Sequence, residues 1–90
     1  MRVVLFGSRA QDGSPTQASD YDVAIVLSDE SSKGVTAEYL RATVPDSSVD
    51  IFPDYYPHRR RIHLLVMSES DYQNRHHPLT RSVRQGQELA

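Results

Sequence analysis

Three acidic residues stand where their carboxylates could do chemistry together. Asp20 and Asp22 open an apolar run, and Asp50 lies between Val49 and Ile51 later in the chain. Side chains two residues apart in a strand point to the same face, so we expect the carboxylates of Asp20 and Asp22 to project together. They would repel unless cations lay between them, and two Mg²⁺ ions suit such hard oxygen ligands. If the strand of Asp50 lies beside that of Asp22, Asp50 adds a third carboxylate while Val49 and Ile51 face the core.

A Gly-Ser pair supplies a possible phosphate site. Gly7 and Ser8 follow the apolar run at 3–6, and Arg9 comes next. Glycine lets the backbone approach a ligand closely, while a serine hydroxyl and successive N–H groups can cradle phosphate oxygens, with Arg9 as an added cation. Metals bridging a triphosphate would stabilise the pyrophosphate leaving group and lower the pKa of an attacking hydroxyl, whose proton Asp50 would accept or steer. These residue types predict in-line transfer of a nucleoside monophosphate.

Each of these motifs has a simpler interpretation when taken by itself. A strand that ends in Gly-Ser is usually a turn, and Asp-x-Asp is usually a strand start or a cap. The ordered combination is rarer: an apolar strand, Gly-Ser, a loop, Asp-x-Asp on an apolar strand, and an apolar-flanked Asp after a helix. The combination therefore carries the prediction of a metal and triphosphate site.

The elements that must position these residues follow from apolar patterning and turn residues. Apolar and β-branched runs predict four strands, over residues 2–6, 21–27, 49–52 and 61–67. In the last of them, Ile62, Leu64 and Val66 alternate with His63 and Leu65. Helical spacing predicts three helices: one over 36–44 with Thr36 as N-cap, one from Glu69 with a capping box at Ser68-x-x-Asp71, and one over 79–85 ending at a left-handed Gly86. This order indicates one small α+β sheet domain spanning residues 1–90.

Composition excludes several classes of protein. The chain of 90 residues has no cysteine, so a disulfide-stapled fold and a zinc ribbon are excluded. Its longest apolar runs are four or five residues, against roughly 20 for a membrane span, and the N-terminal residues lack a signal-peptide pattern. We therefore expect a cytoplasmic protein without a membrane partner.

Charge is divided unevenly along the chain. Residues 1–54 hold nine acids and four bases, a net charge of −5, whereas residues 55–90 hold six arginines and three acids, a net charge of +3. The acidic part suits a cation site, and the basic part suits a polyanion or an acidic partner. Since the chain as a whole has a net charge of −2, sequence-specific DNA binding is not expected.

The stretches VVLFGSRA, SDYDVAIVL and VDIF resemble the minimal nucleotidyltransferases of the DNA polymerase β superfamily. The resemblance implies a small mixed β-sheet of about four strands with helices packed on one face. It implies that Gly7 and Ser8 bind the triphosphate, and that Asp20, Asp22 and Asp50 bind two Mg²⁺ ions and form the catalytic centre. A weaker similarity continues into the tail, so that nearly the whole chain is covered. The chain departs from the family in beginning its first strand at Arg2, where a helix usually precedes it, and in the loop after Arg9.

Stand-alone proteins of this family are similar to antitoxins whose partner is an all-helical ribonuclease toxin of the HEPN class. The resemblance implies transfer of AMP from ATP to a tyrosine hydroxyl of that toxin. A non-catalytic antitoxin that neutralises its partner by forming a complex is the alternative. Transfer to a small molecule such as an aminoglycoside is less favoured, because that chemistry generally needs a second domain to hold the acceptor.

Two other features have both a functional and a structural interpretation. The segment 53–61 (PDYYPHRRR) could grip phosphates or RNA through Arg59, Arg60 and Arg61 while Tyr55 and Tyr56 stack on bases; such a run is more often a solvated strand edge. His76 and His77 lack a metal-ligand spacing with His63, so a surface or capping role is expected for them.

Overall fold

The computed structural model describes residues 1–7, 21–55 and 61–90. Some sequence predictions fall on residues outside these ranges: Ser8, Arg9, Asp20, the loop that joins them, Tyr56, His58, Arg59 and Arg60.

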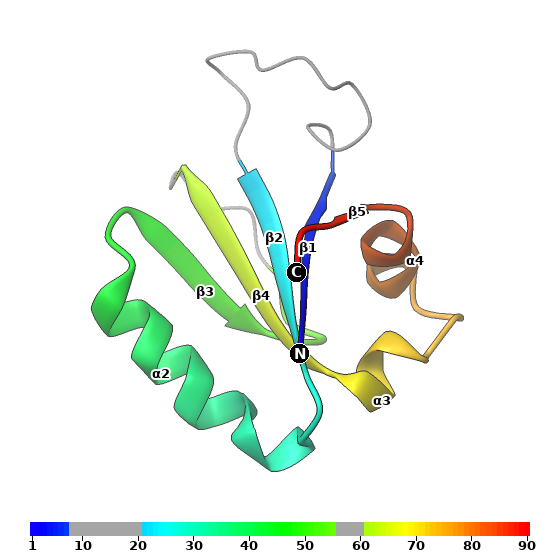
Figure 1. Cartoon of the computed structure of the whole chain (residues 1–90), viewed down its shortest axis with the longest axis horizontal. Coiled ribbons are helices and arrows are strands. Elements are labelled where there is room, and N and C mark those ends of the chain that lie inside the picture. The colour runs from blue at the N-terminus through cyan, green and yellow to red at the C-terminus, as the bar shows by residue number, and fades with distance from the viewer. Residues whose placement is uncertain (8–20, 56–60) are drawn as a thin grey trace.

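The fold is α+β and is built on a mixed sheet of five strands (Figure 1). The strands are β1 (Arg2–Phe6), β2 (Tyr21–Leu27), β3 (Ser47–Ile51), β4 (Ile62–Ser68) and β5 (Gln87–Glu88). Their order across the sheet is β3-β4-β2-β1-β5. Strands β2, β4 and β3 run parallel, while β1 pairs antiparallel with both β2 and β5. The four predicted strands are confirmed to within about two residues at each end, and β5 is an additional short strand.

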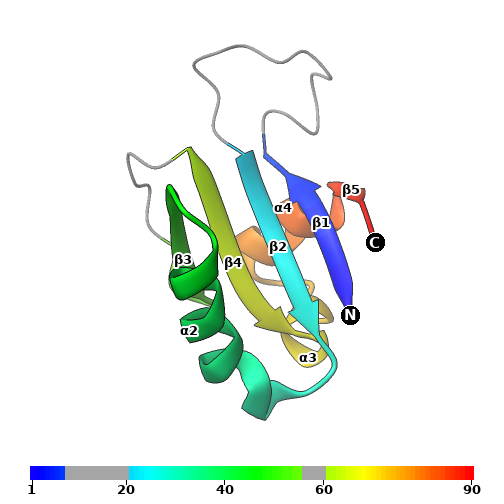
Figure 2. The same ribbon diagram turned by 60° about the vertical axis from the view of Figure 1, so that its left-hand side comes forward.

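Helices cover both faces of this sheet, so the expectation of helices on one face is wrong (Figure 2). The helices are the 3₁₀ turn η1 (Glu30–Ser32), α2 (Lys33–Thr43), α3 (Glu69–Tyr72) and α4 (Pro78–Arg84). Helix α2 packs on one face, and α3 and α4 lie on the other. The reason lies in β4, where Leu64, Leu65, Val66 and Met67 are all buried although they point alternately to the two faces. No helix in the described part of the chain is long and apolar enough to cross a membrane.

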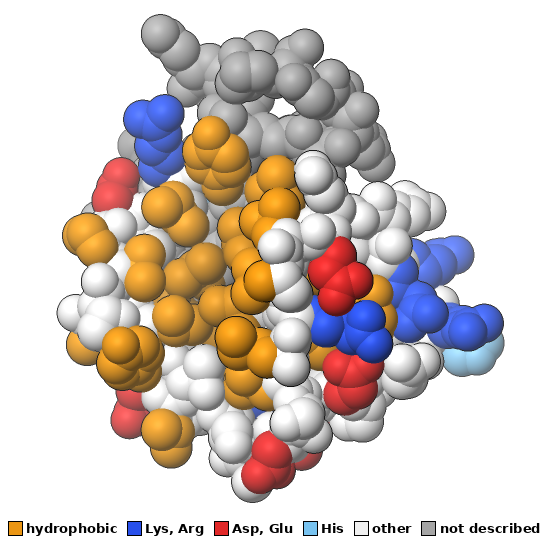
Figure 3. All heavy atoms as spheres, in the orientation of Figure 1, with side chains coloured by type: hydrophobic (Ala, Val, Ile, Leu, Met, Phe, Trp, Pro, Cys, Tyr) orange, Lys and Arg blue, Asp and Glu red, His pale blue; other side chains and the backbone are white. Residues whose placement is uncertain are grey.

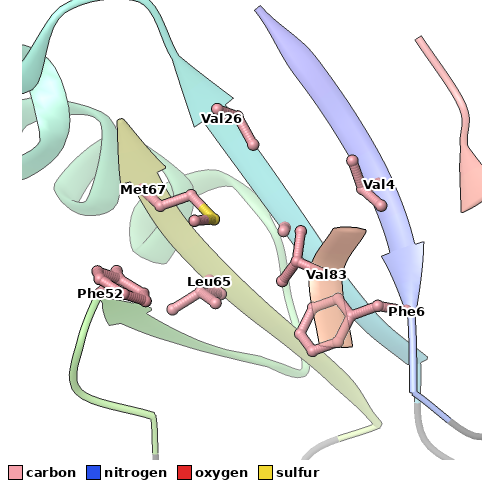
Figure 4. Close-up of a cluster of buried hydrophobic side chains, with 8 residues drawn as sticks. Val4, Phe6, Val26, Phe52, Leu65, Met67 and Val83 are labelled. Atoms are coloured by element: carbon pink, nitrogen blue, oxygen red, sulfur yellow. The ribbon is translucent and has the colours of Figure 1, made fainter. Parts of the chain in front are cut away.

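Two apolar clusters form the core, one on each face of the sheet. On the side of α4, the side chains of β1, β2 and β4 converge on Val83 of the helix (Figure 4); the buried members are Val4, Phe6, Ala24, Val26, Phe52, Leu65, Met67 and Val83. On the side of α2, the buried members are Ala37, Val49, Leu64 and Val66. The site described below lies on the α4 side of the sheet.

The helix ends confirm some of the sequence predictions and correct others. The capping box is present, since Ser68 Oγ accepts from Asp71 N and Asp71 Oδ2 accepts from Ser68 N. His77 caps α4, with Nδ1 accepting from Leu79 N at 3.1 Å. Thr36 is not an N-cap, because α2 begins earlier, at Lys33, and follows directly on η1, which begins at Glu30. Asp29 is the N-cap of η1.

Gly86 follows α4 as expected, but its φ is not positive. Its role is a close approach to β1 instead, because a Cβ at this position would lie 2.4 Å from the carbonyl oxygen of Leu5. The prediction of a left-handed glycine after α4 is therefore wrong, although the sequence was right that a glycine is required there.

Candidate functional site

The end of β1 meets the start of β2 at Gly7 and Asp22. Phe6 pairs with Asp22 in the antiparallel ladder, so Gly7 is the first residue beyond that pair. Gly7 has a φ of +80°, a conformation that residues with a Cβ rarely adopt. A Cβ at Gly7 would lie 2.6 Å from Oδ2 of Asp22, well inside contact distance. Glycine therefore meets two requirements here, the backbone conformation and the space that the carboxylate occupies.

Tyr55 reaches the same carboxylate from the connection between β3 and β4. Because those strands are parallel, the chain must return along the sheet to begin β4, and Tyr55 lies on this return path, packed against the cluster on the α4 side. Its hydroxyl donates a hydrogen bond to Oδ1 of Asp22. Its ring centroid lies 5.9 Å from that of Phe6 and 6.4 Å from that of His63. Tyr55 thus fixes one oxygen of Asp22 while Gly7 lies against the other.

His63 of β4 stands directly opposite Asp22 in the parallel ladder. Its side chain is buried, and its Nδ1 lies 3.7 Å from Asp22 Oδ1, beyond hydrogen-bond distance but close enough for an ion pair when the imidazole is protonated. Ser48 of β3 stands opposite His63 on the other side, and its Oγ is buried without a hydrogen-bond partner among the described residues. Asp22, His63 and Ser48 therefore form a row of polar side chains across three strands on one face.

Asp50 is not on the strand beside Asp22, so that part of the predicted geometry is wrong. Strand β4 lies between β2 and β3, and Asp50 pairs with Leu65, two residues further along than His63. Two strand spacings amount to roughly 10 Å. The cause is that 62–68 is apolar on both faces and takes the central place, whereas β3 carries Ser47, Ser48 and Asp50 and suits the edge.

Other expectations for β3 are confirmed. Val49 is buried in the cluster under α2, and Ile51 packs partly buried against the same cluster. Since alternate residues of a strand point to opposite faces, Asp50 lies on the same face of the sheet as Asp22. The two carboxylates share a face, but β4 separates them.

The described side chains at this site offer a divalent cation only a few donors. Asp22 offers a carboxylate with one oxygen against the Gly7 backbone, and His63 offers an imidazole nitrogen nearby. Within the described residues, no group of three or more His, Cys, Asp or Glu side chains is close enough to hold an ion. Asp20, predicted to share a face with Asp22, is outside these residues. The described donors, Asp22 and His63, could thus supply only part of the ligand set of a metal ion.

Sequence reasoning missed the roles of His63 and Tyr55 beside Asp22. The sequence shows no metal-ligand spacing among His63, His76 and His77, and it places Tyr55 in a segment whose basic residues suggest phosphate or RNA binding. A signal for His63 was present, because it is the one polar residue in the run Ile62–Met67 of an otherwise apolar strand. Its register against Asp22 depends on which strands pair, which the sequence does not state.

No protein-family model matches the chain, and neither the curated proteins nor the solved structures compared with it give a match.

Proposed function

We propose that this chain is a Mg²⁺-dependent nucleotidyltransferase that transfers AMP from ATP to a hydroxyl, most favourably a tyrosine of a HEPN-type toxin that it neutralises. The observation that carries the proposal is the contact between the strand-ending Gly7, with its φ of +80°, and the Asp22 carboxylate. It brings the element predicted to bind phosphate against a residue predicted to bind metal. A cation held by the carboxylate can neutralise charge on a phosphate chain only if the two elements lie this close.

The chain's own residues have distinct parts in this proposal. Asp22, together with Asp20, would hold Mg²⁺; when bound, the ion would polarise phosphate oxygens and stabilise negative charge on the leaving pyrophosphate. Tyr55 orients the Asp22 carboxylate through its hydrogen bond. Ser8 and Arg9 remain predicted phosphate ligands. His63 occupies the place on the neighbouring strand where a third carboxylate was expected, and its imidazole can accept the proton of the attacking hydroxyl.

The proposed activity is tested by incubating the chain with Mg²⁺, each of the four α-labelled nucleoside triphosphates, and the product of the neighbouring gene. Label is expected on the partner protein with ATP, and loss of label is expected with Asp22→Asn. Asp54→Asn is the matched control, since Asp54 is exposed and lies outside the Gly7–Asp22 contact. Absence of transfer from all four nucleotides by the folded chain would reject the proposal.

A second candidate, a binding module that neutralises a partner without catalysis, is favoured by a different observation. The sheet face beside α2 is only partly covered, and apolar side chains gather there in Figure 3. Val23, Ile25 and Leu27 of β2 are only half-buried, while Val35 and Tyr39 of α2 are 73% and 66% exposed. Exposed apolar surface of this kind is typical of protein interfaces.

Asp22→Asn distinguishes the two candidates when binding and neutralisation are measured together. If the chain acts by binding alone, the variant should neutralise its partner as well as the parent protein does. If the chain acts by nucleotide transfer, the variant should bind the partner but lose neutralisation. The variant's unfolding transition must be measured alongside, so that loss of fold is separated from loss of function.

A further inference from the structure

A hollow on the outer side of α4 is lined by three arginines. Arg75 precedes the helix, Arg81 and Arg84 lie on it, and Gln85 follows it; together they line a shallow hollow of about 430 Å³ that is largely open to solvent. Several basic side chains gather at the right-hand side of Figure 3, the side on which α4 lies in Figure 1. None of the lining residues belongs to the site at Gly7 and Asp22. No carboxylate is among the four lining residues, so the hollow, here called the arginine pocket, is cationic.

The arginine pocket differs from two other basic positions on the described surface, Arg2 and Lys33. Arg2 is paired with Glu69 at 3.0 Å and with Glu88 at 3.5 Å. Lys33 is paired with Glu30 at 2.7 Å and with Asp71 at 2.9 Å. Within residues 1–7, 21–55 and 61–90, by contrast, no ion pair joins Arg75, Arg81 or Arg84 to a carboxylate. Three positive charges thus converge without a described counter-charge.

Arg84 is held in place before any ligand binds. One guanidinium nitrogen donates to the carbonyl oxygen of Tyr72 at 2.8 Å, and the guanidinium carbon lies 4.8 Å from the centroid of the Tyr72 ring. A guanidinium has five N–H donors, so this arrangement leaves others for a ligand. The helix dipole favours Arg81 and Arg84 near the end of α4, but it does not account for Arg75, which lies before the helix begins.

The geometry indicates the chemistry of the ligand. Guanidinium groups bind phosphate oxygens through paired, charge-assisted hydrogen bonds, and the hollow, which is shallow and open to solvent, has room for a short phosphate chain. The guanidinium carbons of Arg2 and Arg84 lie 5.0 Å and 4.8 Å from the centroid of the Tyr72 ring. It is therefore already in contact with two guanidinium groups, which leaves little of it for stacking on a base.

We propose that the arginine pocket binds the phosphate chain of a phosphorylated ligand, with little selectivity for the base attached to it. The phosphate chain can belong to a free nucleotide or to the 5′ end of an RNA. The proposal does not depend on nucleotide transfer at Gly7 and Asp22, because the two sites share no residue and guanidinium binding needs no metal.

Binding is tested by calorimetric titration with pyrophosphate, ATP and GTP, in the presence of EDTA so that metal-dependent binding at Asp22 does not contribute. The three ligands are expected to bind with similar affinity. The double variant Arg75→Gln/Arg81→Gln should lower the affinity by roughly tenfold or more, since hydrogen bonds to charged groups are being lost. The side chains of both arginines are exposed and make no hydrogen bond with described residues, so the fold should be kept.

Arg41→Gln is the control for general electrostatics, since Arg41 is an exposed cation on α2, on the other face of the sheet. It should change the affinity less than twofold. An equal loss in Arg41→Gln, or no loss in the double variant, would overturn the proposal. A 5′-triphosphate RNA that binds over tenfold more tightly than ATP would identify an RNA end as the source of the phosphate chain, whereas equal affinity would identify a free nucleotide.

Discussion

The carboxylate of Asp22 lies in the space that a side chain at position 7 would need, with Oδ2 2.6 Å from the place of a Gly7 Cβ. This contact joins the residue that follows β1 to the first residues of β2. It also makes the conformation of Gly7 and the direction of Asp22 interdependent, because neither can change without displacing the other. Substitutions at either residue should therefore affect both local stability and the candidate site.

Gly7→Ala should lower the free energy of unfolding by about 1–2 kcal/mol through its left-handed backbone alone. The contact with Asp22 adds to this loss unless the carboxylate moves away. Gly34→Ala is the matched control, since a Cβ in α2 at this position meets nothing within 4 Å and should be neutral or stabilise by about 0.5–1 kcal/mol. Urea denaturation measures both. Equal stability of the two variants would contradict the strain at Gly7.

Tyr55→Phe should destabilise the protein by about 1–2 kcal/mol, because it removes a hydrogen-bond donor from a carboxylate. The ring contacts with Phe6 and His63 are retained in this variant. Tyr39→Phe removes a hydroxyl from an exposed position and should change stability by less than about 0.5 kcal/mol. If Tyr39→Phe lowers the free energy of unfolding as much as Tyr55→Phe does, the hydrogen bond from Tyr55 to Asp22 contributes nothing to stability.

The strands and one helix start were predictable because their signals are local. Apolar runs bounded by turn residues place β1 and β2 closely, and the capping box at Ser68 and Asp71 marks the start of α3. Strand β5 has no such signal, since Gln87 and Glu88 are exposed and pair with β1 through their backbone. Local patterns determine where an element begins, but they do not say which element it pairs with.

The candidate site was predicted only in part for the same reason. The Gly7–Asp22 contact follows from pairing consecutive strands, and the structure has that pairing. The neighbour of β2 on its other side is β4 rather than β3, so His63 stands where Asp50 was expected. The four consecutive apolar residues Leu64–Met67 are typical of a strand covered on both faces, and that pattern favours a central position in the sheet.

Two serine substitutions compare a buried hydroxyl that has a hydrogen-bond partner with one that has none among the described residues. Ser48 Oγ is buried without a hydrogen-bond partner among the described residues, so Ser48→Ala should leave stability unchanged or raise it by up to about 1 kcal/mol. Ser68 Oγ accepts from Asp71 N at 3.1 Å and caps α3, so Ser68→Ala should lower stability by about 1 kcal/mol. Thermal unfolding of the two variants provides the comparison. A larger loss for Ser48→Ala would show that its hydroxyl has a partner.

The pairing of Glu69 with Arg2 should make stability depend on pH. The hydrogen bond from Arg2 and its charge lower the pKa of Glu69 in the folded state, and burial opposes this only in part. Since the folded-state pKa is depressed, the stabilisation is present above the pKa of the unfolded chain, roughly 4.3, and is lost as pH falls through the folded-state value. Both side chains are more than a third exposed, so the effect should be small and weaker in high salt.

Glu69→Gln should therefore be less stable than the parent protein at pH 7, and the difference should vanish as the solution is acidified below about pH 4. Glu38→Gln is the control, because Glu38 is exposed on α2 and has no ion pair within the described residues. The measurement is the urea midpoint of each protein between neutral and acidic pH. A Glu69→Gln deficit that persisted unchanged at low pH would mean that the side chain stabilises the fold through packing rather than through its charge.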